Sequence, residues 1–121
     1  MFEVETDTAR NLLLIAYREH VRPAELAQGR AQVAAALEAM KPGFRLLTDL
    51  SGLDSMEYAC AAEIEAMMDL FRAKGVAEVV RVVPDPRKDI GFAVMSHFHY
   101  DRETPVLTVD SRAEALEKLS A

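Results

Sequence analysis

The first part of the chain changes from a strand-like to a helix-like distribution of apolar residues. Every second residue of Phe2–Asp7 is acidic, and this period of two predicts a strand with one polar face. Residues 12–17 form an uninterrupted apolar run, which favours a strand covered on both faces. Because the polar segment 8–11 between them is short, the two strands are expected to form a hairpin.

A helix is predicted next, because Pro23 suits a first helical turn and apolar residues then recur on one face. That face carries Leu26, Val33, Leu37 and Met40. Gly29 interrupts the helix and would permit the close approach of another backbone. The Lys-Pro-Gly segment 41–43 is expected to end this helix.

The centre of the chain predicts a third strand and a second helix. The strand begins at 44–47 and runs into a turn expected at Ser51 and Gly52. Asp54 and Glu57 have the spacing of a capping box, so the second helix is expected to start there and to stop at 74–75.

Three further elements are predicted towards the C-terminus, after a Val-rich fourth strand over 76–83 that two prolines end. They are a third helix over 88–101, a fifth strand over 105–109 and a last helix capped by Ser111 with Glu114.

The predicted order is therefore β-β-α-β-α-β-α-β-α, with one hairpin before three crossovers. Right-handed crossovers make strands two to five parallel, so we expect an α/β fold with a mixed, mostly parallel five-stranded sheet and covering helices. Nothing in the sequence resembles a linker or an internal repeat, so residues 1–121 are expected to form a single domain.

Composition narrows the classes of partner. The chain has 14 Lys and Arg against 20 Asp and Glu, and its net charge of −6 gives no positive field to attract nucleic acid. No apolar run approaches the roughly 20 residues of a membrane-spanning helix, and no signal-peptide pattern is visible. We therefore expect a cytoplasmic protein whose lone Cys60 is a core residue.

A short motif follows the third predicted strand. The segment Asp49-Leu50-Ser51-Gly52-Leu53 resembles the D-L-S-G-V motif of STAS domains in the SpoIIAA-like anti-sigma-factor antagonists, whose element order also agrees over almost the whole chain. The resemblance implies a single STAS-like domain. It also implies a bacterial regulatory module that binds a protein partner without catalysis and without a cofactor.

The second half of that family's motif, D-S-S-G-L, is not kept in this sequence. Glu57 stands for the Asp, Tyr58 and Ala59 for the two serines, and Cys60 for the Gly. In switch-type members the second serine accepts a phosphate, and Ala59 has no hydroxyl group to accept one. The resemblance thus implies an interaction module without the serine phospho-switch. Its predicted contact residues are Asp49, Ser51, Ser55, Glu57, Tyr58 and Ala59.

Local chemistry gives some of these residues structural roles as well. Asp49 is expected to accept backbone N–H bonds at the turn that Ser51 shapes, and Ser55 is expected to help the second helix start.

A second interpretation is a carrier or sensor of an apolar small molecule or lipid, which a broader SpoIIAA-like group implies together with contact at a membrane surface. The second and third predicted helices carry more apolar residues than one buried stripe needs. Such a face could serve an apolar ligand or a homodimer. Its candidate residues are Met67, Leu70, Phe71, Phe92 and Met95.

A metal-dependent enzyme is the lesser alternative. His97, His99 and Asp101 have side chains that suit zinc and related ions. On a helix, however, residues two apart point to different sides, so only His97 and Asp101 would share a face. A structural or partner-facing role is therefore favoured for this string, and no metal is predicted.

Overall fold

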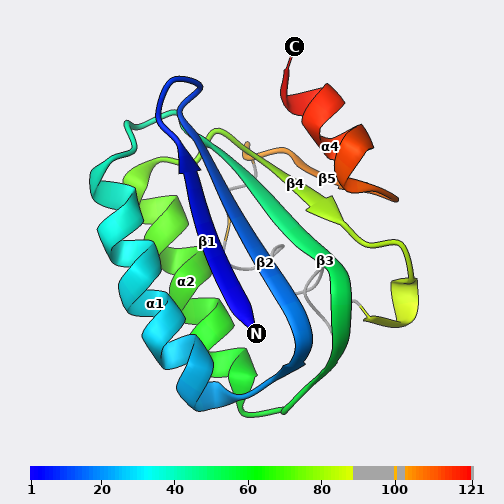
Figure 1. Ribbon diagram of the computed structural model, residues 1–121. Coiled ribbons are helices and arrows are strands. Elements are labelled where there is room, and N and C mark those ends of the chain that lie inside the picture. The colour runs from blue at the N-terminus through cyan, green and yellow to red at the C-terminus, as the bar shows by residue number, and fades with distance from the viewer. Residues whose placement is uncertain (89–99, 101–102, 121) are drawn as a thin grey trace.

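The computed structural model describes residues 1–88, 100 and 103–120 (Figure 1). The strands are β1 (Phe2–Asp7), β2 (Leu12–Val21), β3 (Arg45–Met56), β4 (Glu78–Val82) and β5 (Val106–Val109). The helices are α1 (Pro23–Glu38), α2 (Cys60–Lys74) and α4 (Arg112–Leu119), with a 3₁₀ turn η1 at Pro86–Lys88.

The five strands lie in one sheet in the order β1-β2-β3-β4-β5. β1 and β2 form the antiparallel hairpin, and every later neighbour pair is parallel. The predicted mixed, mostly parallel α/β sheet is therefore confirmed.

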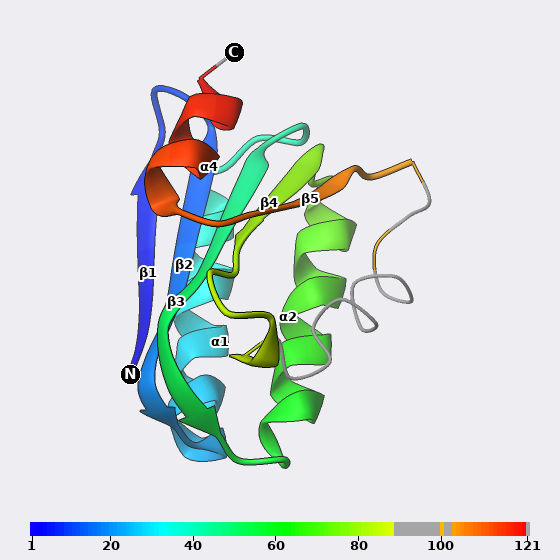
Figure 2. The ribbon, with the colours of Figure 1, turned by 90° about the vertical axis from the view of Figure 1, so that its right-hand side faces the viewer.

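Helices cover both faces of the sheet. Figure 2 shows α1 and α2 on one face and α4 on the other. The larger apolar core lies under α1 and α2, and a second core lies under α4. The second core consists of Leu12, Leu47, Val80, Val82, Val109, Ala115 and Leu119.

The start and the apolar face predicted for α1 are confirmed, but Gly29 does not interrupt the helix, which ends at Glu38, so Met40 lies beyond it. Pro23 occupies the first turn, and Leu26, Val33 and Leu37 are buried. A Cβ atom at Gly29 would lie 2.4 Å from the Phe2 ring of β1, so glycine is what lets these two elements approach.

The predicted turn at Ser51 and Gly52 is wrong, and so is the start of the second helix. β3 continues to Met56, because its second half pairs with the end of β2 up to the register Val21↔Met56. Asp54 therefore lies in a strand and caps no helix, and α2 begins at Cys60 behind Ala59, which makes no side-chain cap. Leu53, 3% exposed, contributes to the larger core from this strand.

The C-terminal elements agree with prediction where they are described. Ser111 caps α4, since its hydroxyl oxygen accepts a hydrogen bond from the Glu114 N–H at 3.1 Å. The helix predicted over 88–101 falls almost entirely outside the described residues. No helix in the described part of the chain is long and apolar enough to cross a membrane.

Candidate protein-interaction surface

The D-L-S-G segment lies within β3, and its aspartate is buried. Asp49 is 4% exposed, and its Oδ1 accepts hydrogen bonds from the Ser51 backbone N–H at 2.9 Å and from the Ser51 hydroxyl at 2.6 Å. Arg112 at the start of α4 donates to Asp49 Oδ2 at 3.4 Å. Asp49 thus accepts a backbone N–H as predicted, but in a strand, where it also ties β3 to α4.

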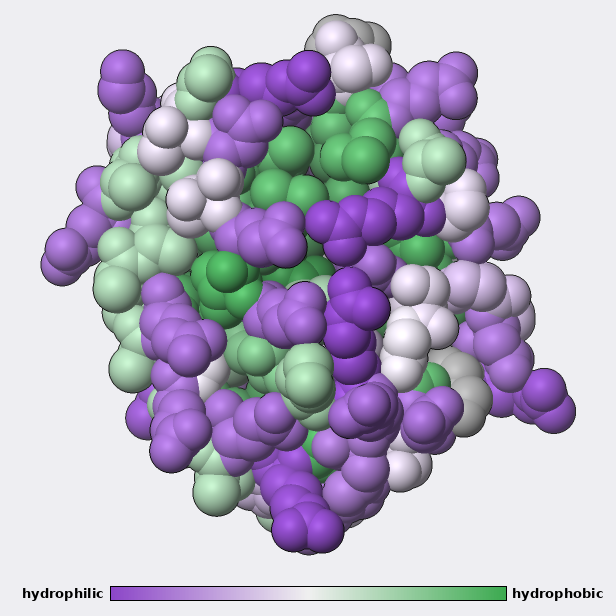
Figure 3. Space-filling model, viewed as in Figure 1, coloured by the Kyte–Doolittle hydropathy of each residue, from purple (hydrophilic) through white to green (hydrophobic). Residues whose placement is uncertain are grey.

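The same face of the sheet carries further ion pairs beside α4. Arg112 also reaches Glu5 of β1 at 3.6 Å, and Arg18 of β2 pairs with Glu3 at 3.3 Å. A Cβ atom at Gly52 would lie 3.2 Å from Cγ of Arg18, so the glycine makes room for that side chain. Hydrophilic side chains accordingly predominate on this face, with smaller apolar areas between them (Figure 3).

Beyond the end of β4, β2 and β3 continue as a two-stranded extension with a polar cluster. Ser55 Oγ lies 2.7 Å from Nδ1 of His20, and Nε2 of the same ring lies 3.4 Å from Glu57 Oε2. Arg22 approaches that carboxylate oxygen at 3.9 Å. Ser55 therefore does not start the helix as expected. Its side chain instead links β3 to β2 through the hydrogen bond with His20.

A tight turn joins this extension to α2. The Glu57 N–H donates to the Val21 carbonyl at 3.2 Å, and the Glu57 carbonyl accepts from the Cys60 N–H at 2.9 Å. Tyr58 lies within the turn and is 94% exposed. The aromatic side chain of Tyr58 is thus exposed to solvent, while the backbone of the neighbouring residues Glu57 and Cys60 is fixed by hydrogen bonds.

Cys60 anchors the start of α2 in the core, as predicted. It is fully buried, and its thiol donates to the Val21 carbonyl at 3.6 Å. Burial raises the pKa of the Cys60 thiol, and the nearby Glu57 carboxylate raises it further. Both effects favour the protonated thiol over the thiolate.

The predicted contact residues fall into two groups. Ser55, Glu57, Tyr58 and Ala59 are exposed and lie together at the end of β3 and before α2, with Ser51 exposed further back on β3. Asp49 is apart from them, in the interior. Sequence reasoning missed His20 and Arg22 as neighbours of Glu57, because the register between β2 and β3 brings them there.

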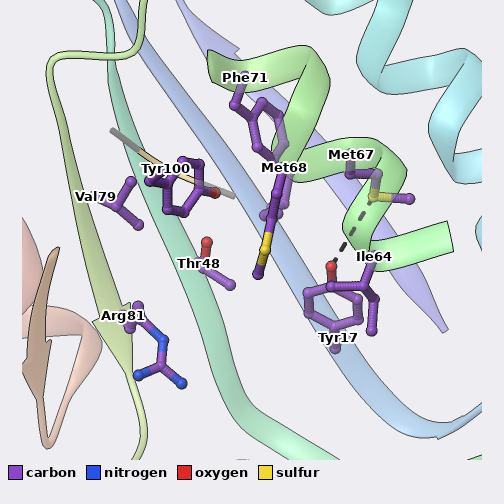
Figure 4. Close-up of a pocket in the computed structure, with 10 residues that line it drawn as sticks. Tyr17, Thr48, Ile64, Met67, Met68, Phe71, Val79, Arg81 and Tyr100 are labelled. Atoms are coloured by element: carbon purple, nitrogen blue, oxygen red, sulfur yellow. Dashed lines mark hydrogen bonds between the residues drawn. The ribbon is translucent and has the colours of Figure 1, made fainter. Parts of the chain in front are cut away.

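The apolar candidates on α2 belong mostly to the core. Met67 and Phe71 are each 1% exposed and line a small cavity between α2 and the sheet (Figure 4). The cavity has a volume of about 20 Å³, which suits a single water molecule. In this conformation the described lining leaves no room for a larger apolar ligand.

Two buried tyrosines line the same cavity. The Tyr17 hydroxyl points to the Met67 sulfur at 4.0 Å, and Tyr100 lies beside Thr48 and Val79 (Figure 4). Burial raises the pKa of Tyr17 and of Tyr100 well above the ordinary tyrosine value of 10.0.

The remaining candidates for an apolar surface or a metal site lie at the α1–α2 groove or outside the described residues. Leu70 is half-buried in an open, alanine-lined groove between α1 and α2. Phe92, Met95, His97, His99 and Asp101 lie outside the described residues. Within the described part of the chain, no three His, Cys, Asp or Glu side chains come together as metal ligands would.

Comparison with solved structures identifies the fold. The anti-sigma factor antagonist SpoIIAA in its unphosphorylated form superposes with a TM-score of 0.69 at 17% identity, covering 100% of this chain and 99% of that one. An uncharacterized DUF3478 protein with a SpoIIAA-like fold from Shewanella loihica PV-4 gives 0.70 at 16% identity, over 98% and 92%. An anti-sigma factor antagonist from Mycobacterium paratuberculosis gives 0.63 at 14%, over 100% and 94%.

These similarities define the class of structure: the chain has a SpoIIAA-like, STAS-type fold along its whole length. The resemblance inferred from the D-L-S-G motif and the element order is thus confirmed for the fold. No protein-family model and no curated protein matches the sequence.

Proposed function

We propose that this chain is a cytoplasmic regulatory module that binds a protein partner and performs no catalysis. Its interaction surface consists of Ser51, Ser55, Glu57, Tyr58 and Ala59. The observation that carries the proposal is Tyr58, 94% exposed between β3 and α2, on a fold shared with anti-sigma factor antagonists.

The physical case rests on anchoring and preorganisation. Tyrosine is enriched among the residues that dominate binding energy at protein interfaces, because it buries a large area while freezing few rotors. The turn that carries Tyr58 is held by the backbone bonds of Glu57, and the Glu57 carboxylate is held by His20 and Arg22. A partner would therefore meet a surface that needs little further ordering.

Binding is proposed to be independent of phosphorylation at position 59. Ala59 is the residue before α2 and offers no hydroxyl group. Asp49 is proposed to act indirectly, by holding Ser51 and β3 in place, since its own carboxylate is buried against Arg112.

The first test is affinity capture followed by measurement of the purified pair. Proteins retained by the immobilised wild-type chain are compared with those retained by Tyr58→Ala, and the retained partner is then titrated against each variant. Truncating an anchoring tyrosine is expected to raise the dissociation constant by at least about tenfold.

The matched control is Lys118→Ala, which truncates another long exposed side chain, on α4 and away from the interaction surface. It is expected to leave the affinity unchanged. Equal affinities for wild type and Tyr58→Ala would overturn the assignment of this surface.

A further inference from the structure

The two edges of the sheet differ in their chemistry. β1 carries Glu3, Glu5 and Asp7 along one edge, and such charges discourage pairing with another strand. β5, at the other edge, reads Val-Leu-Thr-Val and contains no charged residue. In Figure 2 the outer side of β5 faces the viewer, and no described segment lies in front of it.

The backbone bonds of β5 show which peptide groups face outward. The Pro105 carbonyl accepts from the Val79 N–H, and the Val109 carbonyl accepts from the Val83 N–H, both at 2.9 Å. Alternate residues of a strand direct their N–H and C=O groups to opposite sides. Residues 105, 107 and 109 therefore face β4, and the N–H and C=O groups of Val106 and Thr108 face away from it, towards the outer edge.

Exposed apolar side chains gather at the same place. Three of the five large apolar residues that are exposed in the described chain lie here. The exposed fraction is 38% for Val106 and 43% for Leu107, both on β5, and 37% for Leu116 on α4. Leu107 is paired with Val80, whose side chain lies in the core under α4. Leu107 and Leu116 thus lie on the same face of the sheet.

We propose that β5 pairs antiparallel with β5 of a second copy of this chain. Centred on Leu107, this pairing places Val106 opposite Thr108 of the other copy, so all outward N–H and C=O groups of these residues exchange hydrogen bonds. Leu107 then lies directly opposite Leu107 of the other copy, in a position without main-chain hydrogen bonds, where side chains approach most closely.

A second copy is the occupant because the outward groups of Val106 and Thr108 complement those of an identical strand about a two-fold axis, where Leu107 meets its own counterpart. Each chain carries a net charge of −6, so two copies repel one another over most orientations. An uncharged edge with apolar neighbours is the part of the sheet where they can approach. The strand is short, so the interface is smaller than that of a permanent dimer, and dilution is expected to dissociate it.

Sedimentation velocity over a range of concentrations measures the association. The wild type is expected to shift from the monomer mass to twice that mass as concentration rises. Leu107→Lys places like charges opposite each other and is expected to remain monomeric, whereas Gln32→Lys, an exposed site on α1, adds the same charge and is expected to dimerise as wild type.

Val106→Pro provides a second variant that tests the backbone. Proline removes an outward N–H but no bond to β4, so its circular dichroism spectrum is expected to match wild type while dimerisation is lost. A wild-type chain that stays monomeric throughout, or a Val106→Pro chain that folds and still dimerises, would overturn the proposal.

Disulfide trapping tests the register. Leu107→Cys is expected to give a covalent dimer under mild oxidation, because its Cα atoms face each other across the symmetry axis. Val106→Cys faces Thr108 of the other copy and is expected to remain monomeric, and the native Cys60 is buried. More crosslinking at 106 than at 107 would contradict this pairing. None of these variants touches the surface around Tyr58, so this test and that of the proposed function fail independently.

Discussion

Asp49 is a buried carboxylate of β3, and its hydrogen bonds predict a structural role for the D-L-S-G segment. It accepts two hydrogen bonds from Ser51 and one from Arg112, which comes from a helix 63 residues further along the chain. Asp49 therefore joins β3 to α4 from the interior of the molecule.

Asp49→Ala is expected to lower the free energy of unfolding by about 1–3 kcal/mol, because it removes hydrogen bonds to a charged group and leaves Arg112 without one carboxylate. Urea unfolding followed by circular dichroism measures the loss. Glu38→Ala, which removes an exposed carboxylate at the end of α1, is expected to change it by less than about 0.5 kcal/mol. Equal effects of the two substitutions would contradict a structural role for Asp49.

The buried tyrosines predict a loss of stability at alkaline pH. Burial raises the pKa of Tyr17 and Tyr100 in the folded chain, so above pH 10.0 the unfolded chain loses these protons while the folded chain keeps them. The folded state then binds more protons, and the free energy of unfolding falls as pH rises, by up to about 1.4 kcal/mol per unit for each tyrosine.

Tyr17→Phe tests this linkage, because it removes one of the two titrating groups. Urea unfolding of both proteins at several values above pH 10.0 is expected to show a shallower fall for the variant. Parallel slopes for the two proteins would mean that Tyr17 ionises as readily in the folded chain as in the unfolded one.

The contact between α1 and β1 depends on the absence of a side chain. Alanine at position 29 would favour the helix by about 1 kcal/mol in isolation. Its Cβ would meet the buried Phe2 ring at 2.4 Å, and such overpacking costs about 1–3 kcal/mol. We expect Gly29→Ala to lower the melting temperature, and less so in a Phe2→Leu background. A rise in the wild-type background would show that the ring moves aside freely.

α4 depends on its N-cap. Ser111→Ala removes the acceptor for the Glu114 N–H and is expected to cost about 1 kcal/mol in the free energy of unfolding. The matched control is Ser120→Ala at the other end of the helix, whose hydroxyl donates to the Glu117 carbonyl, a group that water can also reach. Chemical denaturation should rank Ser111→Ala as the more harmful; the reverse order would contradict this role of the cap.

The elements also show what local sequence can and cannot predict. Pro23, Gly75 and Ser111 act through their own backbone geometry or nearest neighbours, so the ends of their helices were predictable. Asp54 and Glu57 carry an equally clear capping signal. It is overridden because β3 pairs with β2 as far as Met56, and no local pattern records that pairing.

The same limit applies to the candidate site. The exposed residues before α2 followed from the motif, but the His20 and Arg22 contacts with Glu57 depend on strand register, and the Arg112 contact with Asp49 depends on how α4 packs. Over 98–100% of the chain the SpoIIAA-like fold is shared at 14–18% identity, because a sheet with two apolar cores requires apolar residues at the buried positions but not particular ones.

The proposed interaction surface is tested most directly by hydrogen–deuterium exchange of this chain with and without its purified partner. Binding through the interaction surface predicts slower exchange in peptides that span residues 51–61, with the outer side of β5 and the α1–α2 groove unchanged. Protection confined to another part of the chain, with residues 51–61 exchanging as in the free protein, would contradict it.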